Sequence, residues 1–204
     1  SYNDGSIEGY TYQPEKAKQI LADAGFVDKD GDGFVEDPNG NSFKLTFAAM
    51  SGSDVAEPIT QYYLDAWKQI GVNIELYEGR LLEFNAFYDL LDSDADIDVF
   101  QAAMGVGGDP NPSSQFGRDN QFNMMRWATE ENDKLLAAIN SDAAFEDAAR
   151  KKAYDDWQKY VIDEAPVIPT LYRHSLVSIN NRVKNFDITL GSGTEWQDVE
   201  LTAD

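Results

Sequence analysis

Residues 43–77, FKLTFAAMSGSDVAEPITQYYLDAWKQIGVNIELY, decide the fold of this chain of 204 residues. The first part alternates apolar residues with polar or small ones, which predicts a strand over Phe43–Met50. In the middle part apolar residues recur at helical spacing, so we expect a helix over about Glu57–Ile70, ended by Gly71. The last part, Val72–Tyr77, alternates again and predicts a second strand.

The pattern continues downstream with a helix and a third strand. Leu81–Leu91 has a helical stripe of apolar residues, and Ile97, Val99 and the following alanines read as a strand. This succession predicts an α/β fold, a mixed sheet with flanking helices and right-handed crossovers. Ligands of open α/β sheets bind at the loops beyond the carboxyl ends of the strands. The loop after the third strand is therefore the candidate binding loop.

That loop is part of Gln101–Trp127, QAAMGVGGDPNPSSQFGRDNQFNMMRW. Its glycines allow a close approach of backbone to ligand, while Pro110 and Pro112 stiffen the chain around Asp109. A stiff loop with one carboxylate suits a cationic or polar ligand, because little conformational entropy is lost on binding. The alternative is a surface connection rich in turn formers. The candidate ligand-binding residues are Met104, Gly107, Gly108, Asp109, Asn111, Arg126 and Trp127; for the last two a packing role is an equal alternative.

Upstream, a helix opens at Pro14, and Gly25 closes it; we expect its apolar stripe to face the core. An acidic loop over residues 28–40 follows, in which alternating aspartates precede Gly33. This resembles the first half of a calcium loop, although Asn39 stands where an EF-hand has its bidentate glutamate. A solvated acidic turn is the alternative to a structural calcium ion. The candidate ligands are Asp28, Asp30, Asp32, the carbonyl of Phe34, Glu36 and Asp37.

Downstream of the loop we expect two further helices, Thr129–Asn140 and Phe145–Asp163. The segment Ala165–Arg173 reads as an edge strand because it contains two prolines. Residues 176–179, LVSI, and 186–190, FDITL, are strand-like. The whole of residues 1–204 is expected to form a single α/β lobe.

Composition excludes several functions. The formal charge of −21 opposes binding of nucleic acid or anionic membranes. There is no cysteine, and His174 is the single histidine, so thiolate catalysis and a histidine-rich metal centre are excluded. No serine lies in a nucleophile-elbow context and no phosphate loop is present. We therefore expect a protein that is not an enzyme, with a hydrolase built on a carboxylate pair as a distant alternative.

Four segments carry a resemblance to a known family. They are YTYQPEKAKQILADAGFVDKDGDGF (10–34), WKQIGVNIEL (67–76), GGDPNPSSQFG (107–117) with FNMMRW (122–127), and YDDWQKYVIDEAPVIPTLYR (154–173). In this order they resemble the C-terminal lobe, lobe III, of the family 5 extracellular solute-binding proteins. These are the oligopeptide- and dipeptide-binding receptors of bacterial ABC importers.

The resemblance implies one lobe of a periplasmic-binding-protein-like fold of type II, taken from a longer protein. It implies that an extended oligopeptide binds between this lobe and an N-terminal lobe, and that Asp109, in the Gly-Asp-Pro segment, binds the α-amino group. Met104 and Gly105 depart from the pattern, since many relatives have tryptophan or tyrosine there. The implied partners are permease subunits of the transporter, with no nucleic acid. The implied protein is a monomer, held at a Gram-positive cell surface by a lipid anchor outside this sequence, or periplasmic.

Two other functions fit the same residues. A receptor of the same fold for oligosaccharides or metal chelates would use a different cleft, since fold alone does not determine ligand. A calcium-dependent surface-interaction module would depend on the acidic loop.

Overall fold

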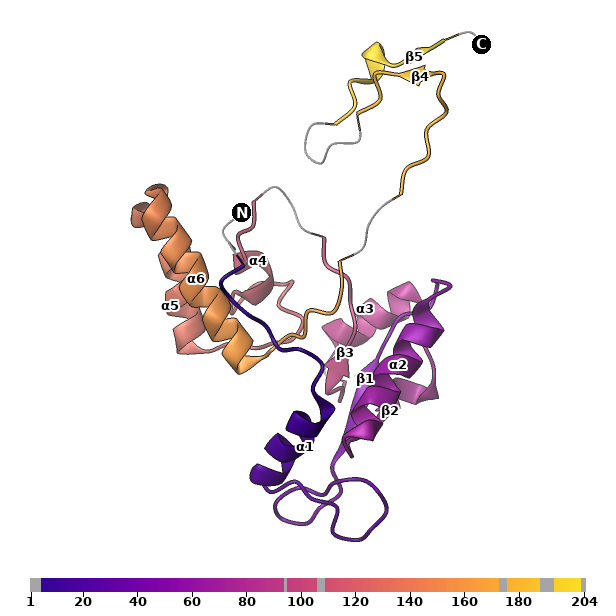
Figure 1. Cartoon of the computed structure of the whole chain (residues 1–204), viewed down its shortest axis with the longest axis vertical. Helices are drawn as coiled ribbons and strands as arrows, with labels where there is room; N and C mark the ends of the chain where they lie inside the picture. The colour runs from indigo at the N-terminus through magenta and orange to yellow at the C-terminus, as the bar shows by residue number, and fades with distance from the viewer. Residues whose placement is uncertain (1–4, 94, 106–108, 173–175, 188–192, 203–204) are drawn as a thin grey trace.

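A three-stranded parallel sheet lies at the centre of the computed structural model, which describes residues 5–93, 95–105, 109–172, 176–187 and 193–202 (Figure 1). Strand β1 (Lys44–Ala48) lies between β2 (Asn73–Leu76) and β3 (Val99–Phe100). Lys44 pairs with Asn73, and Phe47 pairs with both Leu76 and Val99. The strands predicted over residues 43–50 and 72–77 are confirmed, and so is the α/β class. The strand predicted from Ile97, Val99 and the following alanines is confirmed only at Val99–Phe100, and the alanines lie outside it.

The period of two along β1 divides the core between the two faces of the sheet. Phe47 and Ala49 pack with Leu64 of helix α2 (Ala56–Gln69). The alternate residue Ala48 packs on the other side with Phe87 of helix α3 (Phe84–Asp92). Each face is thus covered by one helix of the predicted crossovers. A short 3-10 turn, η1 (Tyr77–Gly79), follows β2 on the way to α3.

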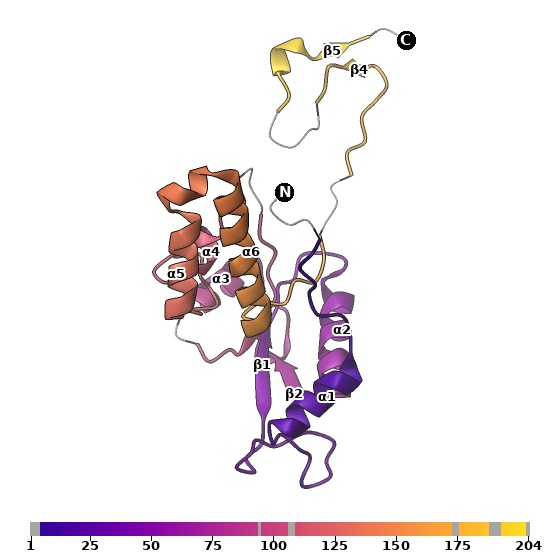
Figure 2. The same cartoon turned by 60° about the vertical axis from the view of Figure 1, so that its left-hand side comes forward.

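A second layer consists of helices that follow the loop after β3. Helix α5 (Glu130–Ile139) and helix α6 (Asp147–Glu164) lie side by side, joined by the 3-10 helix η2 (Asp142–Phe145) (Figures 1 and 2). Both were predicted. The short helix α4 (Ser113–Phe116) was not, because one turn is too short to show a period. Its Phe116 packs with Leu136 and Val161.

The position of helix α1 (Pro14–Asp23) along the chain was predicted correctly, but its burial was not. No residue of α1 is buried, and 57% of Ile20 is exposed. The expectation that its stripe faces the core is therefore wrong for the described chain. One contact of this region with the sheet layer is polar, from the Tyr12 hydroxyl to Gln69 Oε1 of α2 at 2.7 Å.

The C-terminal segment corrects three strand predictions. Residues 165–172 and 176–179 form no strand, and Phe186 and Asp187 are also outside one; residues 188–190 lie outside the described part. Instead, β4 (Val183–Lys184) pairs with β5 (Glu200–Leu201) in an antiparallel hairpin with η3 (Trp196–Asp198). An alternating pattern makes a strand only where a partner strand is available, and the hairpin stands apart from the sheet in both views (Figures 1 and 2). The parallel and antiparallel pairings thus lie in two separate sheets.

The helices of the described residues do not include one whose length and apolar character would suit a membrane crossing.

Candidate functional site

Asp109 lies in the loop that leaves the carboxyl end of β3. Its side chain is 70% exposed, and its Oδ1 accepts a hydrogen bond from the backbone N–H of Asn111 at 3.2 Å. The same Oδ1 lies 3.6 Å from Nη2 of Arg150. Neither contact uses Oδ2. The carboxylate is therefore oriented by its own loop and still presents an oxygen to solvent.

Asn111 anchors this loop to the helical layer. Its Nδ2 donates to Oδ1 of Asn140 at 2.7 Å, and its Oδ1 accepts from the backbone N–H of Ser113 at 3.0 Å. Asn140 Nδ2 in turn donates to Ser113 Oγ at 2.8 Å. These bonds tie the start of α4 to the end of α5. The side chain of Asn111 is thus engaged within the chain, and a role in binding a ligand remains a prediction.

Arg150 brings a positive charge to Asp109 from α6, in the second helical layer. Its side chain is 30% exposed, and its guanidinium carbon lies 5.6 Å from the centre of the Tyr154 ring, one helical turn further on. Stacking of this kind holds a guanidinium in place. Neither Arg150 nor Asn140 was recognised from the sequence. Both are distant from Asp109 along the chain, and no local motif marks them.

The glycine-rich part of the loop contains three further candidates. Met104 is exposed. Gly107 and Gly108 lie outside the described residues.

Arg126 and Trp127 both make contacts within the chain. The Arg126 guanidinium donates to the carbonyl oxygens of Leu91, at 3.1 Å, and Ser93, at the C-terminal end of α3. Trp127 is half-buried beside Phe116 and Tyr160. These contacts favour the packing alternative for both residues.

The acidic loop brings four of its carboxylates together. One oxygen from each of Asp28, Asp30, Asp32 and Glu36 lies within 4.8 Å of the others. The loop is ordered by its own backbone, because Asp28 accepts hydrogen bonds from the N–H groups of Gly31 and Gly33. Converging carboxylate oxygens are the donors that calcium prefers, so the residues fit that ion.

Asp37 takes no part in this group. Its carboxylate accepts hydrogen bonds from the side chain and the backbone N–H of Asn41, at 2.9 and 2.8 Å. These bonds favour the ionised form and lower the pKa of Asp37 below its usual value. Asp37 thus orders the turn that follows, while Phe34 donates its N–H to Asp32.

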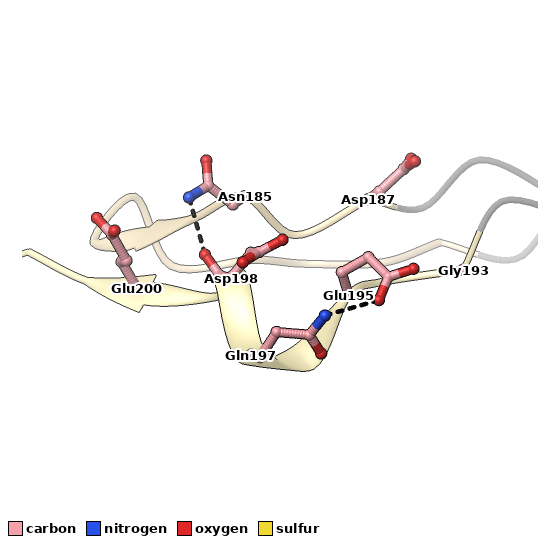
Figure 3. A pocket seen from close by; sticks show the side chains of 7 residues that line it. All are labelled: Asn185, Asp187, Gly193, Glu195, Gln197, Asp198 and Glu200. Atoms are coloured by element: carbon pink, nitrogen blue, oxygen red, sulfur yellow. Dashed lines mark hydrogen bonds between the residues drawn. The ribbon is translucent and has the colours of Figure 1, made fainter.

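A hollow in the C-terminal hairpin is a different kind of site. Its lining is acidic or neutral and contains no basic residue: Asn185, Asp187, Gly193, Glu195, Gln197, Asp198 and Glu200 (Figure 3). Asn185 donates to the carbonyl of Asp198, and Gln197 donates to Glu195, so local bonds shape it. No sequence-predicted candidate lines this hollow.

Comparison with known proteins gives a family match over more than half of the chain. Residues 1–123 match the profile described as "Bacterial extracellular solute-binding proteins, family 5 Middle".

Individual relatives extend this likeness to the whole chain. The oligopeptide-binding protein OppA of Lactococcus lactis subsp. lactis strain IL1403 is 29% identical over 207 residues, which cover 100% of this chain and 34% of that protein. The heme-binding protein A of Haemophilus influenzae is 29% identical, over 91% of this chain and 32% of that protein. The chain thus spans about a third of the length of the curated relatives that it matches.

A solved structure shows the same fold. Lactococcal OppA, complexed with an endogenous peptide in the closed conformation, superposes with a TM-score of 0.88 at 27% identity; the match covers 98% of this chain and 38% of that one. A Thermotoga maritima oligopeptide ABC transporter binding protein, solved with mannohexaose, gives a TM-score of 0.68 at 27% identity, over 79% of this chain and 31% of that one. The two structures hold chemically different ligands on one fold.

Proposed function

Because this chain belongs to family 5 of the bacterial extracellular solute-binding proteins, we propose that it is the C-terminal lobe of a receptor that captures oligopeptides for an ABC importer. The receptor binds its ligand outside the cell and passes it unchanged to permease subunits. It performs no catalysis. As proposed, it works as a monomer at the cell surface through a lipid anchor in another part of the protein, or in the periplasm.

The exposed carboxylate of Asp109 carries the proposal for the ligand. A peptide has one α-ammonium group at a fixed end, and Asp109 Oδ2 takes part in neither of the two contacts that hold Oδ1. The loop is already ordered by Asn111 and Asn140, so little entropy is lost when the ammonium binds. The similarity to OppA over the whole of this chain supports a peptide rather than another cation.

The rest of the peptide is proposed to lie extended between this lobe and an N-terminal lobe of the complete receptor. Backbone hydrogen bonds would provide affinity with little dependence on side chains. Gly107, Gly108 and Asn111 are the proposed hydrogen-bonding groups of this lobe, with Met104 beside them.

Peptide binding is tested by calorimetry on the complete receptor with a pair of peptides of the same sequence, one with a free and one with an acetylated amino terminus. The free peptide should bind more tightly, because only it carries the ammonium. Equal affinities would remove the Asp109 contact from the proposal. Failure of both peptides to bind would refute the ligand class.

Oligosaccharides are the second candidate ligand. The Thermotoga structure with mannohexaose supports them, since its fold matches most of this chain. Competition between a peptide and mannohexaose on the complete receptor separates the two classes. If mannohexaose displaces the peptide but the peptide does not displace mannohexaose, the receptor is one for oligosaccharides.

For the acidic loop we propose a structural calcium ion. Asp28, Asp30, Asp32 and Glu36 supply carboxylate oxygens, and the carbonyl of Phe34 is a further proposed ligand. The ion would neutralise close like charges that otherwise repel one another. Its proposed role is to stabilise the connection between α1 and β1. A calcium-dependent partner surface is the alternative, and would require EDTA to abolish binding of that partner.

A further inference from the structure

The ion pair of Asp109 with Arg150 changes what the proposed ammonium site would recognise. Arg150 Nη2 lies 3.6 Å from Asp109 Oδ1, outside the range of a strong hydrogen bond. The pair joins the binding loop to helix α6. Asp109 is far more exposed than Arg150, whose guanidinium lies against the Tyr154 ring. A ligand therefore meets the carboxylate first and the guanidinium immediately behind it.

Arg150 is not needed to orient the carboxylate. Asp109 Oδ1 already accepts the N–H of Asn111 in the same loop, and Pro110 restricts the backbone between them. The loop is fixed further by the bond from Asn111 to Asn140. The effect of Arg150 on a bound ligand is therefore mainly that of its charge.

The sign of that effect follows from Coulomb's law. An ammonium bound at Asp109 Oδ2 would lie within a few ångströms of the Arg150 guanidinium, and two positive charges repel each other. With Arg150 present, the pair as a whole is close to neutral. Without it, the carboxylate of Asp109 attracts a cation more strongly.

We infer that Arg150 determines how strongly the receptor prefers a free amino terminus: it is an internal counter-ion that weakens the hold of Asp109 on the ligand ammonium. This inference rests on the proposed function, since it requires an ammonium at Asp109. The receptor consequently binds peptides with a free amino terminus and peptides with a blocked one, because the ammonium contributes only part of the affinity.

The test measures one ratio in the complete receptor, the dissociation constant of an acetylated peptide divided by that of the same peptide with a free amino terminus. Arg150→Met keeps an apolar stem against Tyr154 and removes the charge. We expect the ratio to rise roughly three- to tenfold, the effect of one charge at about 5 Å in a partly screened site. The rise should come from tighter binding of the free peptide alone.

Three variants serve as controls. Arg150→Lys keeps the charge and should leave the ratio near that of the unmodified receptor. Lys152→Met removes a charge from the same helix, where Lys152 pairs with Asp156 and not with Asp109, and should leave the ratio unchanged. In an Asp109→Asn background, Arg150→Met should no longer raise the ratio.

The outcomes separate the inference from the proposed function. A ratio of one in the unmodified receptor contradicts the ammonium contact itself. A ratio above one that stays constant or falls in Arg150→Met overturns the inference alone. A general folding defect would weaken both peptides together, so it cannot produce the expected rise.

Discussion

Asp109 and Arg126 were both candidate ligand-binding residues in the sequence, Arg126 with a packing role as an equal alternative. Both are exposed, and their contacts separate them. Asp109 is exposed on a loop, and its contacts involve a single oxygen. Arg126 has its guanidinium on the carbonyl groups at the end of α3, and its own backbone is left-handed, with φ of 54°. A side chain that donates hydrogen bonds to the last carbonyl groups of a helix stabilises the fold.

Replacing Asp109 by alanine should weaken peptide binding to the complete receptor by about 2–5 kcal/mol, the range for loss of one partner of a buried charge pair. Asp109 is exposed in this chain, and the proposed N-terminal lobe would bury it together with the ligand ammonium. Calorimetry on the variant measures this. Asp119→Ala is the matched control, because Asp119 is an exposed acid in the same region and should change little. An affinity unaltered by Asp109→Ala would exclude this carboxylate from the site.

Replacing Arg126 by methionine should lower the free energy of unfolding by about 1.5–3 kcal/mol, because charge-assisted hydrogen bonds to two carbonyls are lost. Chemical denaturation of the chain checks this. The control is Arg80→Met, whose partner Glu78 is exposed and whose loss should cost about 0–1 kcal/mol. Equal losses for the two variants would contradict the role assigned to Arg126.

At the scale of elements, one buried amide connects three helices. Asn132 of α5 is fully buried; its Nδ2 donates to the carbonyl of Phe116 in α4 at 2.7 Å, and its Oδ1 accepts from Trp157 Nε1 of α6 at 3.1 Å. A buried polar group with both functions satisfied fixes the geometry of its neighbours. The helical layer that carries Arg150 and Asn140 is positioned through this residue.

Asn132→Ala should therefore destabilise the chain by about 2–4 kcal/mol, since a carbonyl and an indole N–H would both lose their partner inside the protein. Lys134→Ala on the exposed side of the same helix provides the comparison and should stay within about 0.5 kcal/mol. The midpoint of denaturation with urea reports both. A small effect of Asn132→Ala would mean that water replaces the lost amide.

Calcium should raise the Tm of the chain because the acidic loop is proposed to bind this ion. At a hundred times its dissociation constant, calcium should stabilise the chain by about 2.7 kcal/mol, which is a shift of several degrees in Tm. Asp28→Asn with Asp32→Asn should abolish the shift, while Asp37→Asn should retain it because Asp37 bonds to Asn41. A shift that survives the double substitution would place the ion elsewhere, and no shift would leave a solvated acidic turn.

At the scale of the molecule, the C-terminal segment exposes many apolar side chains. They are Ile168, Leu171, Tyr172, Leu176, Val177, Trp196 and Leu201, with 88% of Tyr172 and 96% of Leu176 exposed. Exposed apolar side chains concentrated in one part of a chain favour an interface there. The structural match to OppA extends over 98% of this chain, so the extended segment has a counterpart in that protein. We propose that the other lobes of the receptor cover it.

Hydrogen exchange measures this directly. Amide protons in residues 168–172 and 176–179 should exchange much more slowly in the complete receptor than in the isolated chain, because burial and new hydrogen bonds restrict opening. Amide protons of β1, which are paired on both sides in the described sheet, should differ little between the two samples. Equal exchange in residues 168–179 would show that this segment stays exposed in the receptor.

The sequence by itself determined the α/β core, most helices and the position of Asp109. These follow from local patterns, because periods of two and of 3.6 residues, proline and glycine act within a few residues. The convergence of acidic side chains in the loop over residues 28–40 was predicted on the same basis, and four of them do lie close together. Metal binding there stays a prediction.

Only the tertiary structure decided which side chains lie beside Asp109 and which segments lack a partner. Arg150 and Asn140 reach the loop through helix packing, which no local pattern encodes. Those strand-like residues after Ala165 that the structure describes do not form the predicted strands, because a strand needs a neighbouring strand to satisfy its hydrogen bonds. Helix α1 shows a similar limit of local patterns. Amphipathic spacing predicts the helix, but whether another surface covers its apolar stripe depends on the whole molecule, and no residue of α1 is buried.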